Sequence, residues 1–382
     1  MSINNKIVIL HVFDDEKFFD FTARFFDALE NVLNKYCFYT PQKEFKFKKI
    51  KSTDKIEVFN DYKKYCRLFS SNEIDIIYFH SLFYNKYKLF NYISNEKIVI
   101  WWSFGADIYH AAKGMKPLVQ LDLYKPLTKK YIVQNTSINV KIKSIVKTIF
   151  SFYYERIRNK VINRIDYFSP VLPLEYHLMK KNPQFRAKPF MINSGPGIYH
   201  PKPLPKIKEP QNILIGNSLT YSNNHLDIFK KLNDISIAPK RKYVVPISYG
   251  DDFPNAKQYF KQCLKAKHII WLEKFIPLNE YTAYLDSITH AIFGFIRQQA
   301  IGNINFCLER GVKIFLYSDS LIYKQLKSLG FKIYTIDQDL TLQSLNEPLD
   351  TESAKINYDI FCETIKDRIS KAKEELTGIL TQ

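Results

Sequence analysis

The sequence has few of the residues and runs that would make it a disulfide-linked, zinc-bound or membrane-spanning protein. Its five cysteines, among 382 residues, are scattered and form no Cys-x-x-Cys pair. We therefore predict a reduced compartment, with neither a disulfide framework nor a cysteine-rich zinc site. No apolar run approaches the ~18–20 residues of a transmembrane helix. The apolar segment Lys6–His11 is followed within a few residues by Asp14, Asp15 and Glu16. A run this short with an acidic end indicates a strand and not a signal peptide.

Two common phosphate-binding motifs are also missing. The chain contains no G-x-G-x-x-G and no P-loop, which argues against a standard NAD site and a Walker-type kinase. We identify no D-x-D motif, and the acidic pairs Asp14-Asp15 and Asp251-Asp252 are interpreted as solvated turns. We expect no metal ion and no cofactor other than a substrate.

Acidic residues are scarce relative to basic ones. Lysine and arginine total 56 against 38 aspartates and glutamates, a formal charge of +18. Such a surface suits an anionic partner. The charge alone does not decide whether that partner is nucleic acid, anionic lipid or a phosphorylated substrate. The 46% hydrophobic and 15% aromatic content indicates a folded chain, and the length suggests two domains.

Short apolar segments alternate with helical patterns in both halves of the chain. This alternation predicts parallel sheets covered on both faces by helices, in two doubly wound domains. The strands expected in the first half are Ile7–Phe13, Tyr36–Tyr39, Ile74–Phe79, Ile98–Phe104, Tyr167–Leu172 and Lys188–Asn193, with helices at Phe18–Val32 and Val58–Ser70. Those in the second half are Asn212–Ile215, Lys242–Pro246, His268–Leu272, Ala291–Phe295, Val312–Tyr317 and Phe331–Thr335.

The glycine- and proline-rich stretch 196–211 is the clearest linker. It separates an N-terminal domain, residues 1–195, from a C-terminal domain, residues 212–350, and a polar helical pattern fills 351–382. Residues 136–165 combine an apolar helical face with many lysines. That segment is interpreted either as a packed helix or as a helix lying on an anionic membrane or lipid carrier.

The stretch 289–311 contains an apolar strand that turns polar at Arg297-Gln298-Gln299 and passes Gly302-Asn303 into a helix. A strand that opens onto a helix N-terminus forms an anion site, because unpaired N–H groups and the helix dipole face the turn. An ordinary strand–helix turn is the alternative.

Other loops at expected strand ends carry small or polar residues. They are Gly216, Asn217 and Ser218, then Asn223 and His225, then Pro246 and Tyr249, and finally Glu280. In parallel sheets, ligands bind at the carboxyl ends of the strands, so these residues are candidate nucleotide contacts. Helix capping would explain the Ser and Asn residues equally well.

Several side chains at other expected strand ends could act as a general base in catalysis. In the N-terminal domain the candidates are Asp107 and His80, then His11 and Asp14, all in or near expected strand ends. A helix-cap role for Asp107 and a structural hydrogen bond for His80 are the alternatives.

Several motifs occur in one order along the chain: His11 with Arg24–Leu29 (RFFDAL), Trp102 with Gly105–Tyr109 (GADIY), Ile215–Ser218 (IGNS) with Ser222–His225 (SNNH), Val244–Pro246 (VVP) with Tyr249, and Arg297–Gly302 (RQQAIG). Together they resemble the bacterial 4-acetamido-4,6-dideoxygalactose (Fuc4NAc) transferases, which act in enterobacterial common antigen synthesis. The extended basic segment and Asn303-Ile-Asn305 depart from that pattern.

The resemblance implies a GT-B glycosyltransferase, an α/β protein with two Rossmann-like domains facing across a cleft. It implies a dTDP-sugar donor held near Gly216–Ser218, Arg297 as the residue that neutralises the leaving dTDP, and Gln298 and Gln299 on the sugar. The acceptor would be a polyprenyl-diphosphate-linked saccharide at the cytoplasmic face of the bacterial inner membrane. A UDP- or GDP-sugar donor, an inactive homologue and a nucleic-acid-binding protein are the rival hypotheses.

Overall fold

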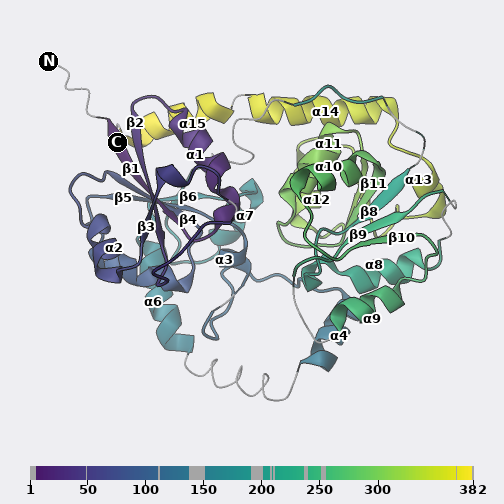
Figure 1. Cartoon of the computed structure of the whole chain (residues 1–382), viewed down its shortest axis with the longest axis horizontal. Coiled ribbons are helices and arrows are strands. Elements are labelled where there is room, and N and C mark those ends of the chain that lie inside the picture. The colour runs from purple at the N-terminus through teal and green to yellow at the C-terminus, as the bar shows by residue number, and fades with distance from the viewer. Residues whose placement is uncertain are drawn as a thin grey trace. The chain divides into compact units, whose positions relative to one another are not determined.

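A computed structural model describes residues 6–48, 50–110, 112–136, 151–190, 201–206, 209, 211–235, 240–250, 255–366 and 368–380. The chain forms two compact units (Figure 1). Unit 1 comprises Met1–Gln120, Ile142–His200 and Lys366–Gln382, and unit 2 comprises Leu121–Lys141 and Pro201–Ile365. Parts of two predicted segments, the linker and the basic amphipathic segment, lie outside the described residues, as do Asp251 and Asp252.

Unit 1 is built on a seven-stranded sheet in the order β3-β2-β1-β4-β5-β6-β7, in which every described pairing is parallel. The strands are β1 (Ile7–Phe13), β2 (Val32–Tyr39), β3 (Ile56–Phe59), β4 (Ile76–His80), β5 (Ile98–Trp102), β6 (Tyr167–Ser169) and β7 (Lys188–Pro189). The helices are α1 (Phe19–Asp27), α2 (Tyr62–Phe69), α3 (Ala106–Tyr109), α6 (Ser151–Asn163), α7 (Pro173–Met179) and α15 (Arg368–Leu380). Every residue of β4 is buried, as expected for a strand covered on both faces.

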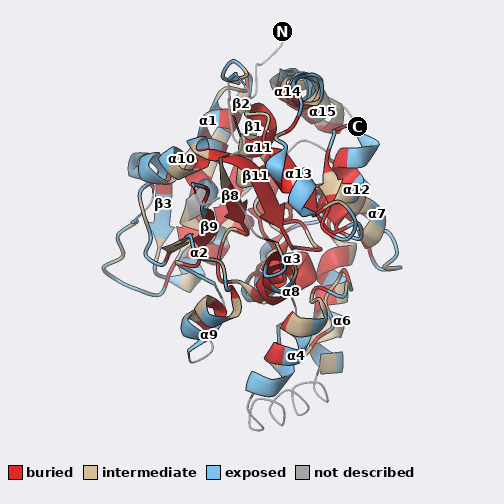
Figure 2. Ribbon diagram, turned by 90° about the vertical axis from the view of Figure 1, so that its right-hand side faces the viewer, coloured by how far each residue is buried: buried red, intermediate tan, exposed pale blue. Residues whose placement is uncertain are grey.

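Unit 2 has a six-stranded sheet in the order β10-β9-β8-β11-β12-β13, again with parallel pairings. Its strands are β8 (Asn212–Ile215), β9 (Tyr243–Pro246), β10 (Ile269–Leu272), β11 (Ile288–Phe293), β12 (Lys313–Leu316) and β13 (Tyr334–Thr335). Its helices are α4 (Pro126–Asn135), α8 (His225–Leu232), α9 (Ala256–Cys263), α10 (Leu278–Asp286), α11 (Ile301–Glu309), α12 (Leu321–Ser328), α13 (Leu342–Asn346) and α14 (Thr351–Lys366). Strands β8, β9 and β11 form the buried centre of this unit (Figure 2).

The structure differs from the predicted secondary structure around residue 58. A helix was expected over Val58–Ser70, but β3 occupies the start of that range and pairs with β2. Helix α2 begins only after Asp61, whose carboxylate accepts hydrogen bonds from the Lys63 and Lys64 N–H groups. The Asp61 cap therefore fixes the N-terminus of α2, which the apolar spacing alone predicted too early in the sequence.

The division into units also differs from the predicted domains at two places. Residues 121–141 were assigned to the N-terminal domain, but α4 packs in unit 2, where Tyr131 stacks on Tyr259 at 4.6 Å. The expected single C-terminal helix is two helices: α14 lies in unit 2, and α15 buries Ala372, Leu376 and Ile379 in the core of unit 1.

Candidate functional site

The turn after β8 is the first part of the candidate site, and its backbone requires glycine. Gly216 has φ of +65°, a conformation that other residues adopt only with strain. A Cβ atom at this position would also lie 2.6 Å from His225 Nε2. The predicted Gly216 turn and the start of α8 are therefore in direct contact.

A chain of hydrogen bonds joins the ends of three neighbouring strands. The Ser222 hydroxyl donates to Gln299 Oε1 at 2.7 Å, and Gln299 Nε2 donates to Asn217 Oδ1 at 3.0 Å. Asn217 Nδ2 in turn donates to the Tyr249 hydroxyl at 3.3 Å. Three sequence motifs that follow β8, β9 and β11 thus form one polar cluster at the carboxyl edge of the sheet, where ligands of such folds bind.

Asn223 holds the loop beneath this cluster. Its Nδ2 donates to the Ser218 carbonyl and hydroxyl, at 3.0 and 3.2 Å, and to the Thr220 carbonyl. Asn223 Oδ1 and Gln298 Oε1 are buried without a hydrogen-bond partner among the described residues. Buried acceptors of this kind are usually satisfied, so they indicate room for a donor from water or a ligand.

His225 is the first residue of α8 and is fully buried. Desolvation lowers its pKa to about 4, although a contact with the Ile215 backbone acts in the opposite direction. The ring is therefore neutral at pH 7. A neutral imidazole beside the Gly216 turn can donate one hydrogen bond and accept another, but it cannot neutralise the charge of a phosphate.

The N-terminus of α11 is the part of the site that suits an anion. Ala300 precedes the helix in a left-handed conformation, and a Cβ atom on Gly302 would meet no atom within 4 Å. Asn303 Nδ2 donates to the Tyr281 hydroxyl at 2.9 Å. Arg297 is half buried, and its Nη1 donates to the Gln298 carbonyl at 2.7 Å. The first N–H groups of a helix favour a bound anion, and Arg297 precedes the start of α11 by four residues.

The remaining predicted nucleotide contacts occupy different environments. Pro246 is buried at the end of β9 and pairs with Leu272. Glu280 lies in the first turn of α10 and is exposed. Its neighbour Tyr281 contacts Asn303, so the starts of α10 and α11 lie side by side.

In unit 1 the two candidate histidines form a buried pair. His11 Nδ1 lies 3.0 Å from His80 Nε2, and His11 Nε2 lies 3.0 Å from Asn34 Oδ1. Because Asn34 Oδ1 can only accept, His11 Nε2 carries the proton and His80 Nε2 donates to His11 Nδ1. Burial lowers the pKa of His11 to about 4 and that of His80 well below its ordinary value. Both rings are therefore neutral.

Asp14 and Asp107 reach the same turn, which follows β4. Ser81, with φ of 74°, donates to Asp14 Oδ1 at 2.8 Å, and Asp14 also pairs with the buried Lys86 at 3.0 Å. Asp107 accepts from the Leu82 N–H at 2.9 Å. The structure thus brings all four predicted base candidates together around one turn.

Asp107 has a second, structural set of contacts. Its carboxylate accepts from Trp101 Nε1 at 2.8 Å and from the Phe104 N–H at 3.0 Å. Desolvation raises its pKa, and these donors oppose the rise. The alternative given from sequence was a helix cap, but Asp107 lies inside α3, whose N-cap residue is Gly105. Its structural role is instead to accept hydrogen bonds from neighbouring loop N–H groups.

Lys86 and Glu175 are among the buried charged residues that the sequence motifs did not indicate. Lys86 lies in a 3₁₀ segment without apolar periodicity, and it donates to the carbonyls of His80 and Ser81. Glu175 is fully buried, accepts from the Tyr109 hydroxyl at 2.6 Å, and has its pKa raised to about 7 by desolvation. For Glu175, the sequence offers only its position three residues after Leu172, the N-cap of α7, as an indication of a special role.

The expectation that the chain lacks a D-x-D motif is wrong, because Asp337-Gln338-Asp339 is one. Asp337 accepts from the Ser318 N–H, and Asp339 accepts from the N–H and hydroxyl of Thr335. These carboxylates fix a turn after β13. Within the described part of the chain no group of three or more His, Cys, Asp or Glu side chains is arranged to hold a metal ion, and the metal independence of the reaction stays a prediction.

Solved structures with the same architecture are glycosyltransferases and related sugar-transferring enzymes. The lipopolysaccharide outer core galactosyltransferase WaaB matches with a TM-score of 0.53 and 11% identity, over 97% of this chain and 99% of that one. The sucrose-phosphate synthase of Thermosynechococcus elongatus gives 0.58 and 7%, over 98% and 100%. An E. coli trehalose-6-phosphate structure bound with UDP-2-fluoro glucose gives 0.54 and 11%, over 98% and 99%.

Two parallel α/β sheets and these neighbours define the GT-B fold. Residues 196–353 match the model of the family described as 4-alpha-L-fucosyltransferase, glycosyl transferase group 56. This match agrees, over the C-terminal unit, with the resemblance predicted from sequence, and it supports glycosyl transfer in general.

Proposed function

We propose that the protein transfers Fuc4NAc, or a similar amino-dideoxy sugar, from a dTDP donor to a polyprenyl-diphosphate-linked saccharide in bacterial surface polysaccharide synthesis. The main supporting observation is the hydrogen-bonded series Ser222, Gln299, Asn217 and Tyr249 next to the start of α11. Amides and hydroxyls can orient a sugar. The helix N-terminus and Arg297 can stabilise the diphosphate that leaves.

The acceptor side of the proposal rests on unit 1. Asp14, His80, His11 and Asp107 surround the turn after β4, and one of them would take the proton of the acceptor hydroxyl if the reaction inverts the anomeric centre. His80 is the candidate with an unused ring nitrogen, since its Nδ1 has no partner among the described residues. Asp107 is engaged by three donors and is the less suitable base.

The membrane location is proposed from helix α6. Phe152, Arg156 and Lys160 are all exposed and follow one another at four-residue spacing, so they share a face of this helix. An exposed aromatic side chain beside cations suits an anionic lipid surface. Among the described residues, no helix combines the length and apolar character required for membrane spanning.

A nucleotide screen with one variant tests the donor half of the proposal. Thermal shifts with dTDP, UDP and GDP should be largest for dTDP. Replacing Arg297 by alanine should weaken dTDP binding about 10–100-fold, the usual effect of losing a charged hydrogen bond. The exposed Arg186→Ala serves as a charge-matched control. Turnover is then followed by mass spectrometry of a polyprenyl-diphosphate disaccharide.

Other outcomes would select the rival hypotheses. A larger shift with UDP or GDP, also lost in Arg297→Ala, would replace the dTDP donor while keeping the reaction class. Salt-sensitive binding of oligonucleotides without any nucleotide shift would identify a nucleic-acid-binding protein instead. Nucleotide binding without turnover on any acceptor would identify an inactive homologue.

A further inference from the structure

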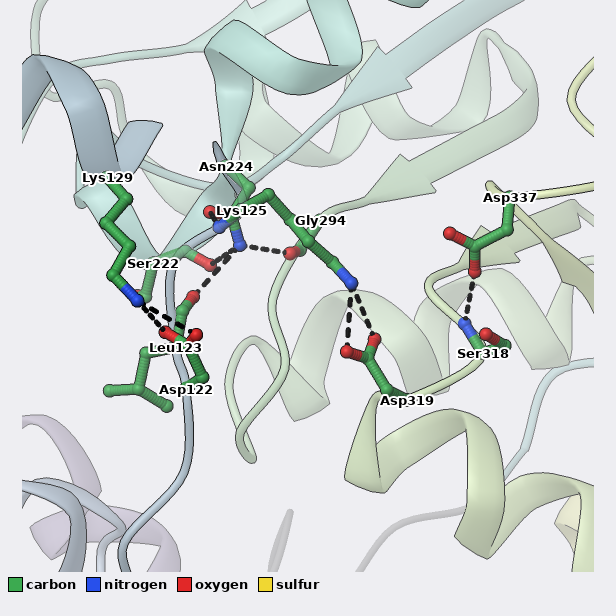
Figure 3. A network of polar contacts seen from close by, with 10 residues as sticks. All are labelled: Asp122, Leu123, Lys125, Lys129, Ser222, Asn224, Gly294, Ser318, Asp319 and Asp337. Atoms are coloured by element: carbon green, nitrogen blue, oxygen red, sulfur yellow. Dashed lines mark hydrogen bonds and ion pairs between the residues drawn. The ribbon is translucent and has the colours of Figure 1, made fainter. Parts of the chain in front are cut away.

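A short segment from the first half of the chain packs against the loop that carries Ser222 and Asn223. Residues 122–128, which we call the strap, include the first turn of α4 and the residues before it, and they belong to unit 2. Asn224 Nδ2 donates to the Leu123 carbonyl at 3.1 Å and to the Gly294 carbonyl at 2.7 Å, and its Oδ1 accepts from the Lys125 N–H at 2.8 Å (Figure 3). One fully buried side chain thus connects the strap, the start of α8 and the chain after β11.

Two further contacts hold the strap in place. The Asp227 carboxylate accepts from the Leu127 N–H, the Thr128 N–H and the Thr128 hydroxyl at 2.7–3.0 Å, so α8 caps the N-terminus of α4. The Lys125 ammonium pairs with Asp319 at 2.9 Å and lies 4.3 Å from the centre of the Tyr317 ring. The strap is therefore a fixed part of the unit.

The loop that the strap holds is in direct contact with the candidate site. Asn224 itself has φ of 52° and directly follows Ser222 and Asn223. A Cβ atom on Gly294 would lie 2.1 Å from the Asn223 carbonyl oxygen, so the two backbones touch. A shift of Asn224 would displace the Ser222 hydroxyl from Gln299, and with it Asn217. Displacements of about 1 Å in such groups are costly for binding and turnover.

We propose that Asn224 and the strap are positioning elements for a nucleoside-diphosphate sugar, and that they set its affinity without touching it. This inference rests on the function proposed for the cluster of Ser222, Gln299 and Asn217. The strap supplies two backbone groups, the Leu123 carbonyl and the Lys125 N–H, that fix Asn224. No side chain of the strap takes part in these two bonds.

The first test replaces Asn224 by glycine in the full-length protein. Glycine adopts a positive φ freely, so this change removes the four side-chain hydrogen bonds of Asn224, to Leu123, Lys125, Ser222 and Gly294, and leaves the backbone conformation accessible. We expect the Kd for the nucleotide that the wild type binds, and the KM for its sugar donor, to rise about tenfold. The KM for the acceptor should stay within about twofold, which general loss of structure would not give.

A second variant leaves Asn224 intact and loosens the strap. Asp227→Ala removes the cap of α4, and we expect the same selective rise in donor KM, smaller than for Asn224→Gly. Lys129→Ala is the matched control, because Lys129 pairs with Asp122 on the exposed side of the strap and contributes little. Its donor KM should equal that of the wild type.

The results separate the two proposals. If the wild type binds dTDP, UDP or GDP, but Asn224→Gly and Asp227→Ala bind it equally well, the positioning role is wrong and the proposed function stands. Equal rises in donor and acceptor KM would also overturn it. If the wild type binds none of the nucleotides, the proposed function fails and the positioning role fails with it.

Discussion

Four buried histidines give the folded state a definite response to acid. The pKa values of His11, His225 and His290 are lowered to about 4, mainly by desolvation, and burial holds the pKa of His80 well below its ordinary value. Between pH 6.5 and 4 the unfolded chain binds protons that the folded chain does not, so stability falls as the pH falls. A pKa moved from 6.5 to 4 corresponds to on the order of 3 kcal/mol.

A buried carboxyl group with a raised pKa changes the pH dependence of stability in the opposite direction. It therefore provides a control for the histidine effect. The pKa of Glu175 is raised to about 7, so the folded state binds its proton more tightly and gains stability as the pH falls from 7 toward 4.5. Because the histidines outnumber such groups, urea unfolding at pH 7 and pH 5 should show lower stability at pH 5. Glu175→Gln should steepen this dependence. A stability that is flat or rises on acidification would contradict the prediction.

Asp107 offers a test that separates structure from catalysis. Removing its carboxylate leaves three buried donors, on Trp101, Leu82 and Phe104, without an acceptor. We expect Asp107→Ala to lower the free energy of unfolding by about 3 kcal/mol or more, measured by chemical denaturation. An Asp107→Asn variant with wild-type stability and turnover reduced about 1,000-fold or more would instead make it the base.

The polar residues of unit 2 could be predicted because each follows an expected strand. Parallel strands bring their carboxyl ends to one edge, so Asn217 and Gln299 were expected near each other although 82 residues separate them. The partners of the unit 1 residues could not be predicted. The His11–His80 contact depends on the placement of β4 beside β1, and the Lys86–Asp14 pair involves a segment without apolar periodicity.

At the scale of elements, helix α11 contains Gly302. Glycine lowers the stability of a helix, and no close packing at this position requires it. Nothing surrounds the Cβ position of Gly302 within 4 Å, and the same is true of Gly378 in α15. Replacing either by alanine should raise stability by about 0.5–1 kcal/mol, because glycine weakens a helix. If Gly302 borders the diphosphate, only Gly302→Ala should also weaken nucleotide binding.

Thermal unfolding and nucleotide titration of the two variants measure both effects. Since both glycines are helical and open, Gly378→Ala controls for the change in helix propensity. Equal nucleotide affinity in Gly302→Ala and the wild type would show that the open space beside α11 is not used by the donor.

Strand and helix identity was predictable in unit 2 because alternation there is regular, and its predicted strands all occur. Boundaries shifted where a turn or cap, not apolar spacing, ends the element. Helix α1 ends at Asp27 and β2 begins at Val32, within the range expected to be one helix. Four residues of turn between two apolar segments leave little sign in a helical pattern.

At the scale of the whole molecule, the chain passes between the units more often than a single linker predicts. Residues 121–141 join unit 2, and residues 366–382 return to unit 1. Sequence patterns report that a segment is amphipathic, but not which core buries its apolar face. The partner of α4 is specified by Asp227 and Asn224, residues about 100 positions away, which local periodicity does not detect.

The net charge and α6 together predict binding to anionic membranes. Phe152 is 77% exposed on this helix and shares a face with Arg156 and Lys160. Full-length protein should bind vesicles containing anionic lipid, and the binding should weaken at high salt. Phe152→Ala should weaken it about tenfold, the worth of burying one aromatic side chain. Phe275, which is 76% exposed in unit 2, provides the matched control, Phe275→Ala. Vesicle co-sedimentation measures both variants, and equal losses or salt-independent binding would show that α6 is not the lipid-facing surface.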